Sequence, residues 1–176
     1  MLVETESPKV LKRAAFHEGN IPKGGTCLSS FVILRSKDGI LAGKMTKPEI
    51  WVEKFLVGES FAPKYAASNK WMLPASHLIY GERPEDAATR ILTEQVGLAK
   101  AKLKLSQVQS HLSQSPTDPE AAHWDICFVY EGQRGRKVRK PDWFSELKFL
   151  KPRTLKVDDF TRGHGDVLLE LGMIRN

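Results

Sequence analysis

The segment from Leu73 to Leu98, LPASHLIYGERPEDAATRILTEQVGL, contains residues whose types and spacing could support chemistry on phosphates. Glu82 precedes Arg90, and Glu94 follows Arg90 by four residues, about one helical turn. Carboxylates can hold a hard cation such as Mg2+, and a guanidinium can orient a carboxylate or a phosphate. The segment is therefore a candidate phosphate-binding site.

The same residues have the pattern of an amphipathic helix. Pro84 suits a first helical turn, and Gly97 suits the position just after a last turn. Asp86, Arg90 and Glu94 stand four apart and could form a ladder of ion pairs. The positions expected on the buried face recur at helical spacing: Ala87, Ala88, Ile91, Leu92 and Gln95. Taken alone, this pattern predicts a well-capped, half-buried helix.

The segment also resembles the Nudix box, G-x5-E-x7-R-E-U-x-E-E-x-G-U, where U is an apolar residue. Six positions match without a gap: Glu82, Arg90, Leu92, Glu94, Gly97 and Leu98. The preceding Leu73–Pro74 and the small pair Ala87–Ala88 also resemble the family, and the similarity extends over roughly residues 24–172. The resemblance to the Nudix hydrolase superfamily implies an α/β (α+β) fold with a mixed sheet sandwiched between helices.

Three positions depart from the box: Ser76 replaces its first glycine, and Ile91 and Gln95 replace two of its glutamates. In the family the box carboxylates hold a divalent cation that activates hydrolysis of a diphosphate linkage. At 100° per residue, positions 91, 94 and 95 lie within a stripe of about 100° and could face one ion. Only Glu94 of the three is acidic here, so the resemblance implies a weak Mg2+ or Mn2+ site.

The resemblance also implies roles for individual residues. Glu94 is expected to bind the metal, with Gln95 and the carbonyl of Ser76 as weaker ligands. Glu82 is expected to support the site from the loop, and Arg90 to orient Glu94 or Glu82. No residue is assigned as general base, because Ile91 occupies a position that could have carried one.

Other polar residues are candidates for substrate contact. Lys44 and Arg35, in strand-like segments, could face a phosphate, as could His77 in the loop entering the box; solvent exposure is the simpler alternative for each. The basic run Arg134–Lys140, followed by Trp143, suits RNA contact or a charged hairpin tip. His164 and Asp166, beside glycines, suit either a late-loop acid–base pair or the start of a helix.

The composition is that of a soluble globular chain. It has 176 residues, of which 41% are hydrophobic, and a net charge of +6 that favours polyanionic partners or simply a solvated basic surface. No apolar run is long enough for a membrane span or a secretion signal, so we expect a cytoplasmic protein with no membrane partner. Cys27 and Cys127 lie in apolar runs and are expected to be reduced core residues.

Several elements must position the box. We expect an N-terminal arm at 1–24 and a Nudix-like domain at 25–176, which opens with a hairpin of strands at 27–36 and 40–45. An insertion at about 46–69 suits a short helix, a lid, or a partner surface such as a homodimer contact. Further predicted elements are a short strand at 70–74, strands at 103–113 and 123–132 joined by a loop at 114–122, and a final helix that Asp158 or Asp159 begins and Gly172 ends.

Three functional hypotheses follow. The leading one is a divergent Nudix-type hydrolase of nucleoside-diphosphate-linked compounds, because Glu82, Arg90 and Glu94 persist together. Nucleotide sugars are a candidate substrate class, since FVILRSKDGILAGKMTKP resembles the opening hairpin of GDP-mannose mannosyl hydrolases. The second is a catalytically impaired Nudix-fold protein that binds a nucleotide or RNA. The third is an interaction module that acts through a partner surface.

Overall fold

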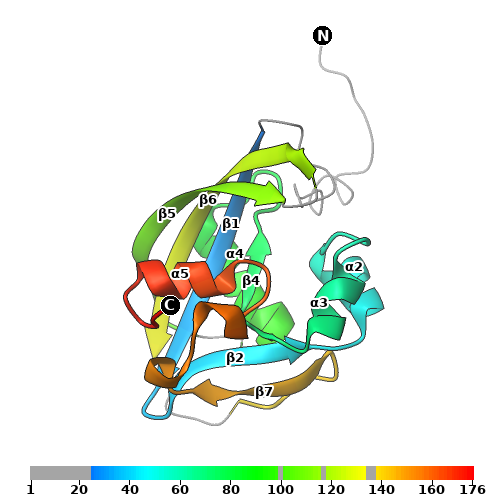
Figure 1. Cartoon of the computed structure of the whole chain (residues 1–176). Helices are drawn as coiled ribbons and strands as arrows, with labels where there is room; N and C mark the ends of the chain where they lie inside the picture. The colour runs from blue at the N-terminus through cyan, green and yellow to red at the C-terminus, as the bar shows by residue number, and fades with distance from the viewer. Residues whose placement is uncertain (1–24, 99–100, 116–117, 134–137) are drawn as a thin grey trace.

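The computed structural model describes residues 25–98, 101–115, 118–133 and 138–176, so the predicted arm at 1–24 lies outside the described residues. Within these ranges the fold is a mixed α+β domain built on one seven-stranded sheet of order β3-β2-β1-β6-β5, with β4 beside β1 and β7 beside β2 (Figure 1). The strands are β1 Thr26–Ser36, β2 Gly39–Met45, β3 Trp71–Met72, β4 Ala75–His77, β5 Leu103–Ser115, β6 Asp118–Gln133 and β7 Phe144–Leu150. The helices are α2 Pro48–Phe55, α3 Ala62–Ser68, α4 Pro84–Val96 and α5 His164–Glu170, with 3-10 turns η1 Pro152–Thr154 and η2 Val157–Asp159.

Strand β1 is central to the sheet. It runs parallel to β6 along ten residue pairs and antiparallel to both β2 and β4. Because side chains alternate along a strand, Val32 and Leu34 face α4, whereas Phe31 and Ile33 face α5. The two helices therefore cover opposite faces of the sheet, α4 behind it and α5 in front of it in Figure 1. This arrangement confirms the predicted sandwich.

Helix α4 forms as the sequence predicts. Pro84 occupies its first turn, and Gly97 caps it at φ 72°, a left-handed conformation that glycine adopts without steric cost. Its N-terminus is fixed to the sheet because the hydroxyl of Ser30 donates a hydrogen bond of 2.9 Å to the carbonyl of Pro84. All five predicted inward positions are buried, together with Val96.

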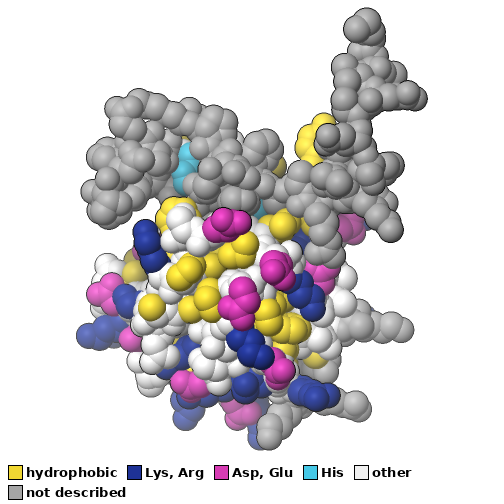
Figure 2. Space-filling model, turned by 90° about the vertical axis from the view of Figure 1, so that its right-hand side faces the viewer, with side chains coloured by type: hydrophobic (Ala, Val, Ile, Leu, Met, Phe, Trp, Pro, Cys, Tyr) yellow, Lys and Arg dark blue, Asp and Glu magenta, His cyan; other side chains and the backbone are white. Residues whose placement is uncertain are grey.

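The insertion at 46–69 contains α2 and α3 and belongs to the domain core. Trp51 is fully buried, and its indole N–H donates a hydrogen bond of 3.0 Å to the carbonyl of Trp143. Phe55 and Ala62 pack in the same cluster, which also holds Met45 at the end of β2. Figure 2 shows the side of the molecule where α2 and α3 lie, with apolar, acidic and basic side chains interspersed on its surface.

Two predicted boundaries are wrong. The predicted loop at 114–122 is mostly strand, because β5 continues to Ser115 and β6 begins at Asp118. The final helix begins only at His164, after the 3-10 turn η2 and the left-handed residues Arg162 and Gly163, where the Thr161 N–H bonds to the Trp71 carbonyl at 2.9 Å. Asp159 instead accepts the N–H of Lys156 within η2.

Both cysteines are free and buried, as predicted. Burial raises the pKa of each thiol, that of Cys127 to about 12, so neither is a nucleophilic thiolate at neutral pH. None of the helices in the described ranges has the length and apolar character that a membrane span requires.

Because the insertion contributes to the core, Trp51→Ala should lower the free energy of unfolding by about 3–5 kcal/mol, as expected for a large buried aromatic side chain. Urea denaturation followed by far-UV circular dichroism measures this loss. Trp124, which is 48% exposed, provides the matched control, and Trp124→Ala should cost less than about 1 kcal/mol. Equal losses in the two variants would contradict this account of the insertion.

Candidate functional site at the α4 helix

An ion pair fastens the loop before α4 to the helix itself. The guanidinium of Arg90 donates two hydrogen bonds to the carboxylate of Glu82, at 2.7 and 2.8 Å, and a third to the carbonyl of His77 at 3.0 Å. Glu82 also accepts the backbone N–H of Ile79 at 3.0 Å. The two charged side chains are only 16% and 13% exposed, so little water competes with the pair. This Glu82–Arg90 clamp fixes the path of residues 77–82.

The ion-pair ladder predicted for Asp86, Arg90 and Glu94 along α4 does not form. Arg90 turns to Glu82 in the loop, and Asp86 pairs with Arg83, one turn earlier, at 2.8 Å. The latter pair is exposed on the helix surface, where it contributes little.

Ile91 and Gln95, which stand on α4 where the box has glutamates, both face the sheet. Ile91 is fully buried among Val32, Leu41 and other apolar side chains of the core beneath α4. Gln95 is 1% exposed and forms a two-way pair with the backbone of Ala75. Its amide nitrogen donates to the Ala75 carbonyl at 2.8 Å, and its amide oxygen accepts the Ala75 N–H at 3.3 Å. Both side chains therefore serve packing and sheet–helix attachment.

Ser76 and His77 lie in strand β4, which corrects the expectation that His77 is in a loop. Ser76 is 6% exposed and stands opposite Ser30 in the β1–β4 ladder, so its backbone is part of the sheet. His77 pairs with Ser29 in the same ladder and is 7% exposed. The carbonyl of His77 accepts a hydrogen bond from Arg90 of the clamp. Its side chain lies on the same face of the sheet as Ala75, which is the face that α5 covers.

Lys44 and Arg35 also lie on the α5 side of the sheet and away from α4. Lys44 forms an ion pair of 2.9 Å with Glu146 and lies 4.7 Å from the centre of the Trp71 ring. Arg35 pairs with Glu131 at 2.7 Å, and six residues along β1 separate it from Ser29, a distance of about 20 Å. The structure brings neither residue to the box helix.

The predicted RNA-contacting run falls largely outside the described residues, which omit 134–137. Of its remaining cationic residues, Arg139 is exposed, and Lys140 donates a hydrogen bond of 2.7 Å to the carbonyl of Phe144.

The predicted pair of His164 and Asp166 lies at the start of α5, which covers the opposite face of the sheet from α4. His164 is 1% exposed and points inward, whereas Asp166 is exposed, so they do not form an acid–base pair. Burial first, and then the charges of Arg162 and His77, hold the pKa of His164 well below its usual range. Arg162 was not among the predicted site residues, although the run Arg-Gly-His-Gly is a signal that could have drawn attention to it.

Comparison with known proteins identifies the family. A model of the NUDIX domain matches residues 31–171, most of the chain, so the chain belongs to the NUDIX domain family. An RNA pyrophosphohydrolase from Vibrio atlanticus (strain LGP32) is 31% identical over 87 residues, which are 49% of this chain and 47% of that protein. The chain thus matches about half the length of that relative.

Solved structures share the fold. A MutT protein from Methanosarcina mazei Go1 superimposes with a TM-score of 0.55 at 13% identity, covering 85% of this chain and 95% of that one. The E. coli dihydroneopterin triphosphate pyrophosphohydrolase superimposes with a TM-score of 0.56 at 11% identity, covering 82% and 92%. A C. elegans Ap4A hydrolase does so with a TM-score of 0.52 at 13% identity, covering 83% and 95%. At these identities the similarity establishes the fold alone.

Nudix hydrolases generally use divalent metals, and the donor set on α4 can be compared with that requirement. Hard cations bind sites rich in carboxylate oxygens, and affinity rises with the number of charged ligands. Here Ile91 has no donor atom, the amide of Gln95 is engaged by Ala75, and Glu94 is the single carboxylate of the three positions. In the described ranges, no three His, Cys, Asp or Glu side chains are grouped so that they could hold a metal. These residues do not fit the family's carboxylate site.

The clamp should contribute measurably to stability. Arg90→Gln removes the charge opposite a mostly buried carboxylate, so we expect a loss of about 2–3 kcal/mol, less than for a fully buried pair because some water reaches both groups. Amide hydrogen exchange should also accelerate at Ile79, whose N–H the clamp holds. Arg83→Gln is the matched control on the same helix, and the midpoint of urea unfolding should not shift, because its pair with Asp86 is exposed. Similar effects of the two variants would rule out a special role for the clamp.

Restoring one family carboxylate should make stability depend on pH. Gln95→Glu places an ionised carboxylate against the carbonyl of Ala75, where the amide now donates a hydrogen bond. The repulsion and the burial favour the protonated form, so the new carboxyl should have a pKa raised above the unfolded value of about 4.3. The variant should then be nearly as stable as the wild type below about pH 4 and lose stability as the pH rises through the raised pKa.

Thermal unfolding of Gln95→Glu between pH 4 and pH 8 measures this effect. Gln133→Glu, at an exposed position, is the control and should follow the wild-type pH profile. A flat difference between Gln95→Glu and the wild type across this range would show that Gln95 does not hold Ala75 as described.

Proposed function

We propose that this chain is a Nudix-fold binding protein for a nucleoside-diphosphate-linked compound and lacks the three-carboxylate hydrolysis of its family. The observation that carries the proposal is the placement of Ile91 and Gln95. Both side chains are turned toward the sheet and committed to packing or backbone pairing, which leaves Glu94 as the single acid of the metal-binding stripe. A binding role requires no such stripe.

The ligand class is supported by the family and by charge. The similar proteins have names that refer to an RNA pyrophosphohydrolase, a dihydroneopterin triphosphate pyrophosphohydrolase and an Ap4A hydrolase. Each name refers to a compound with linked phosphates, and the RNA and Ap4A names refer to nucleotides. A chain with a net charge of +6 attracts such polyanions.

Hydrolysis of the same compounds, with nucleotide sugars among them, is the second candidate function. The retained Glu82, Arg90 and Glu94 favour it, since the clamp places Glu82 beside the helix that carries Glu94. In this alternative Glu94 is the principal ligand of a weak Mg2+ or Mn2+ site. RNA contact through Arg134–Lys140, a homodimer and a purely interacting role remain predictions.

Calorimetric titration tests the two functions against each other. ADP and UDP-glucose are titrated into the full chain in EDTA and then in Mg2+ or Mn2+, while 31P NMR follows any product. The binding function predicts an affinity in EDTA that agrees within twofold with the affinity in metal, and no turnover.

Glu94→Gln and Glu59→Gln form a matched pair of variants, because Glu59 is an exposed acid that does not belong to α4. Metal-dependent turnover that Glu94→Gln abolishes and Glu59→Gln preserves would establish the hydrolase instead. An absence of affinity for both compounds in EDTA would overturn the binding proposal.

A further inference from the structure

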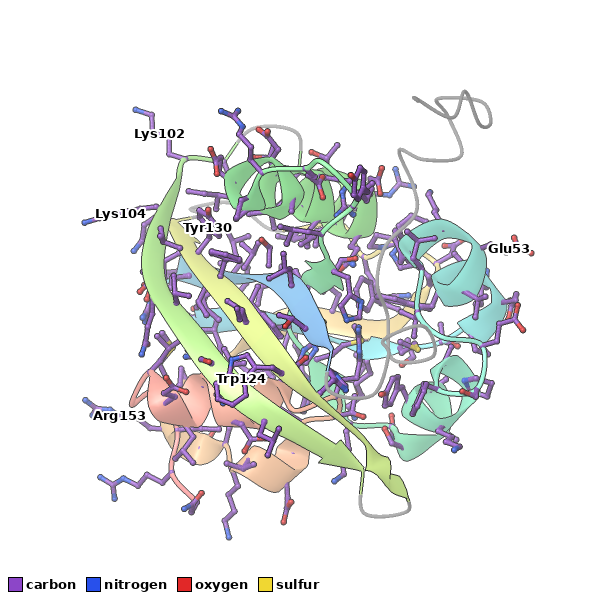
Figure 3. All side chains as sticks on the ribbon, turned by 90° about the horizontal axis from the view of Figure 1, so that it is seen from above. Glu53, Lys102, Lys104, Trp124, Tyr130 and Arg153 are labelled. Atoms are coloured by element: carbon purple, nitrogen blue, oxygen red, sulfur yellow. The ribbon has the colours of Figure 1, made fainter. Side chains whose placement is uncertain are left out.

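Strand β5 forms one edge of the sheet. It pairs antiparallel with β6, and within the described ranges no strand pairs with its other side. Figure 3 shows β5 as the outermost strand, with Lys104 near its start projecting away from the domain. The strand has 13 residues and therefore extends over about 40 Å. Its outer side presents a row of backbone N–H and C=O groups over this length.

This edge lacks the residues that usually protect an edge from further pairing. From Leu105 to Ser115 the sequence LSQVQSHLSQS contains no Lys, Arg, Asp, Glu or Pro, in a chain of which 27% is charged. Proteins commonly place Lys or Pro on an exposed edge, because a charge or a missing N–H prevents another strand from adding there. An uncharged edge of this length is a template for one more strand.

Apolar side chains line the edge on the face of the sheet that α4 partly covers. Leu105, Val108 and Leu112 are 44%, 50% and 54% exposed, and we call them the edge stripe. Val108 lies opposite Phe128 of β6, which packs against the core beneath α4, so the stripe continues that core outward. Burial of these side chains against a second strand removes apolar surface from water, which favours association.

The edge stripe is symmetric about Gln109. Three pairs of the β5–β6 ladder define its positions: Leu105–Tyr130, Gln109–Cys127 and Leu112–Trp124. Tyr130 and Trp124 each stand three residues from Cys127, because the bulge after Leu105 adds one residue to β5. Leu105 and Leu112 are therefore equally far from Gln109 along the strand, about 10 Å each.

A surface with this symmetry is complementary to itself. A two-fold axis at Gln109, perpendicular to the sheet, pairs β5 antiparallel with β5 of a second copy and places Leu105 of each copy opposite Leu112 of the other. Lys104 lies opposite Glu131, four residues from Cys127, so the two Lys104 side chains are eight positions apart, about 27 Å. No like charges meet across the axis. A second copy thus matches this edge in both shape and charge.

We propose that two copies of this chain form a homodimer by antiparallel pairing of β5 with β5 about a two-fold axis at Gln109. The two sheets then become one continuous sheet, and the edge stripes of the two copies cover each other. The insertion at 46–69, where the sequence suggested a homodimer contact, packs into the domain core instead. The dimer requires no ligand, so the inference stands apart from the proposed function.

Analytical ultracentrifugation of the full chain tests the dimer. The wild type should change from the monomer mass of 19.8 kDa to twice that mass as its concentration rises through the micromolar range, as expected for a small interface. Val108→Lys places two lysines on either side of the axis, at diagonal positions about 7–8 Å apart. Their repulsion should raise the dissociation constant at least tenfold. Because Val108 is half exposed, the variant should fold, which thermal unfolding checks.

A mixture of two variants tests the position of the axis. Val108→Glu alone should weaken the dimer as Val108→Lys does, because it brings two like charges together. An equal mixture of the two variants should restore dimers at wild-type concentrations, since each Lys then lies beside a Glu of the other copy. Tyr80→Lys is the matched control, because it adds the same charge at an exposed apolar residue outside β5. Its dissociation constant should agree with that of the wild type within twofold.

Three outcomes would overturn the proposal. A wild type that stays monomeric at every concentration would leave the edge to an extended peptide of another protein. A dimer that Val108→Lys and Tyr80→Lys affect equally would use another surface. Single variants that are monomeric and stay so when mixed would place the axis elsewhere than at Gln109.

Discussion

The attachment of α4 to the sheet governs the chemistry of this protein. Gln95 exchanges two hydrogen bonds with the backbone of Ala75, and one turn away Ile91 fills the core between the helix and the sheet. Residues four apart on a helix share a face, so a face that meets the sheet through these two side chains cannot also present them to a metal ion. The same contact that stabilises the domain thus removes two of the three positions of the family's metal-binding stripe.

The Glu82–Arg90 clamp is compatible with this change because its geometry depends on no metal. Three hydrogen bonds from one guanidinium join the loop and the helix, and a backbone N–H completes the coordination of the carboxylate. The clamp determines where His77 emerges on the other face of the sheet. A structural feature that matches the family's box is therefore retained although two of the neighbouring carboxylates are absent.

The family's usual approach to phosphate is through a metal ion. Nudix hydrolases generally use divalent metals, and carboxylates hold such a cation, which in turn attracts phosphate oxygens. Of the three positions on α4, this chain keeps one carboxylate, Glu94, and a binding role requires no activated water. The insertion that carries α2 and α3 is held in place by its own core around Trp51.

Local signals in the sequence were sufficient for much of this architecture. The proline, the glycine and the helical spacing of small and apolar residues predicted α4 and its buried face, including Ile91 and Gln95, because capping and periodicity act between residues close in the chain. The box spacing identified the family for the same reason. The same spacing also fitted a stripe facing a metal ion, and only the tertiary structure decided that those two residues point at the sheet.

The partners of charged residues were decided by tertiary structure. Lys44 and Arg35 were plausible phosphate ligands until the fold placed Glu146 and Glu131 beside them. Alternation along a strand tells which residues share a face, but not which helix or which charges will cover it. The hydrogen bond from the Leu73 N–H to the ring of His164 joins residues 91 apart in the chain. Contacts at such separation arise only when the sheet brings the segments together, and for that reason no local pattern predicted them.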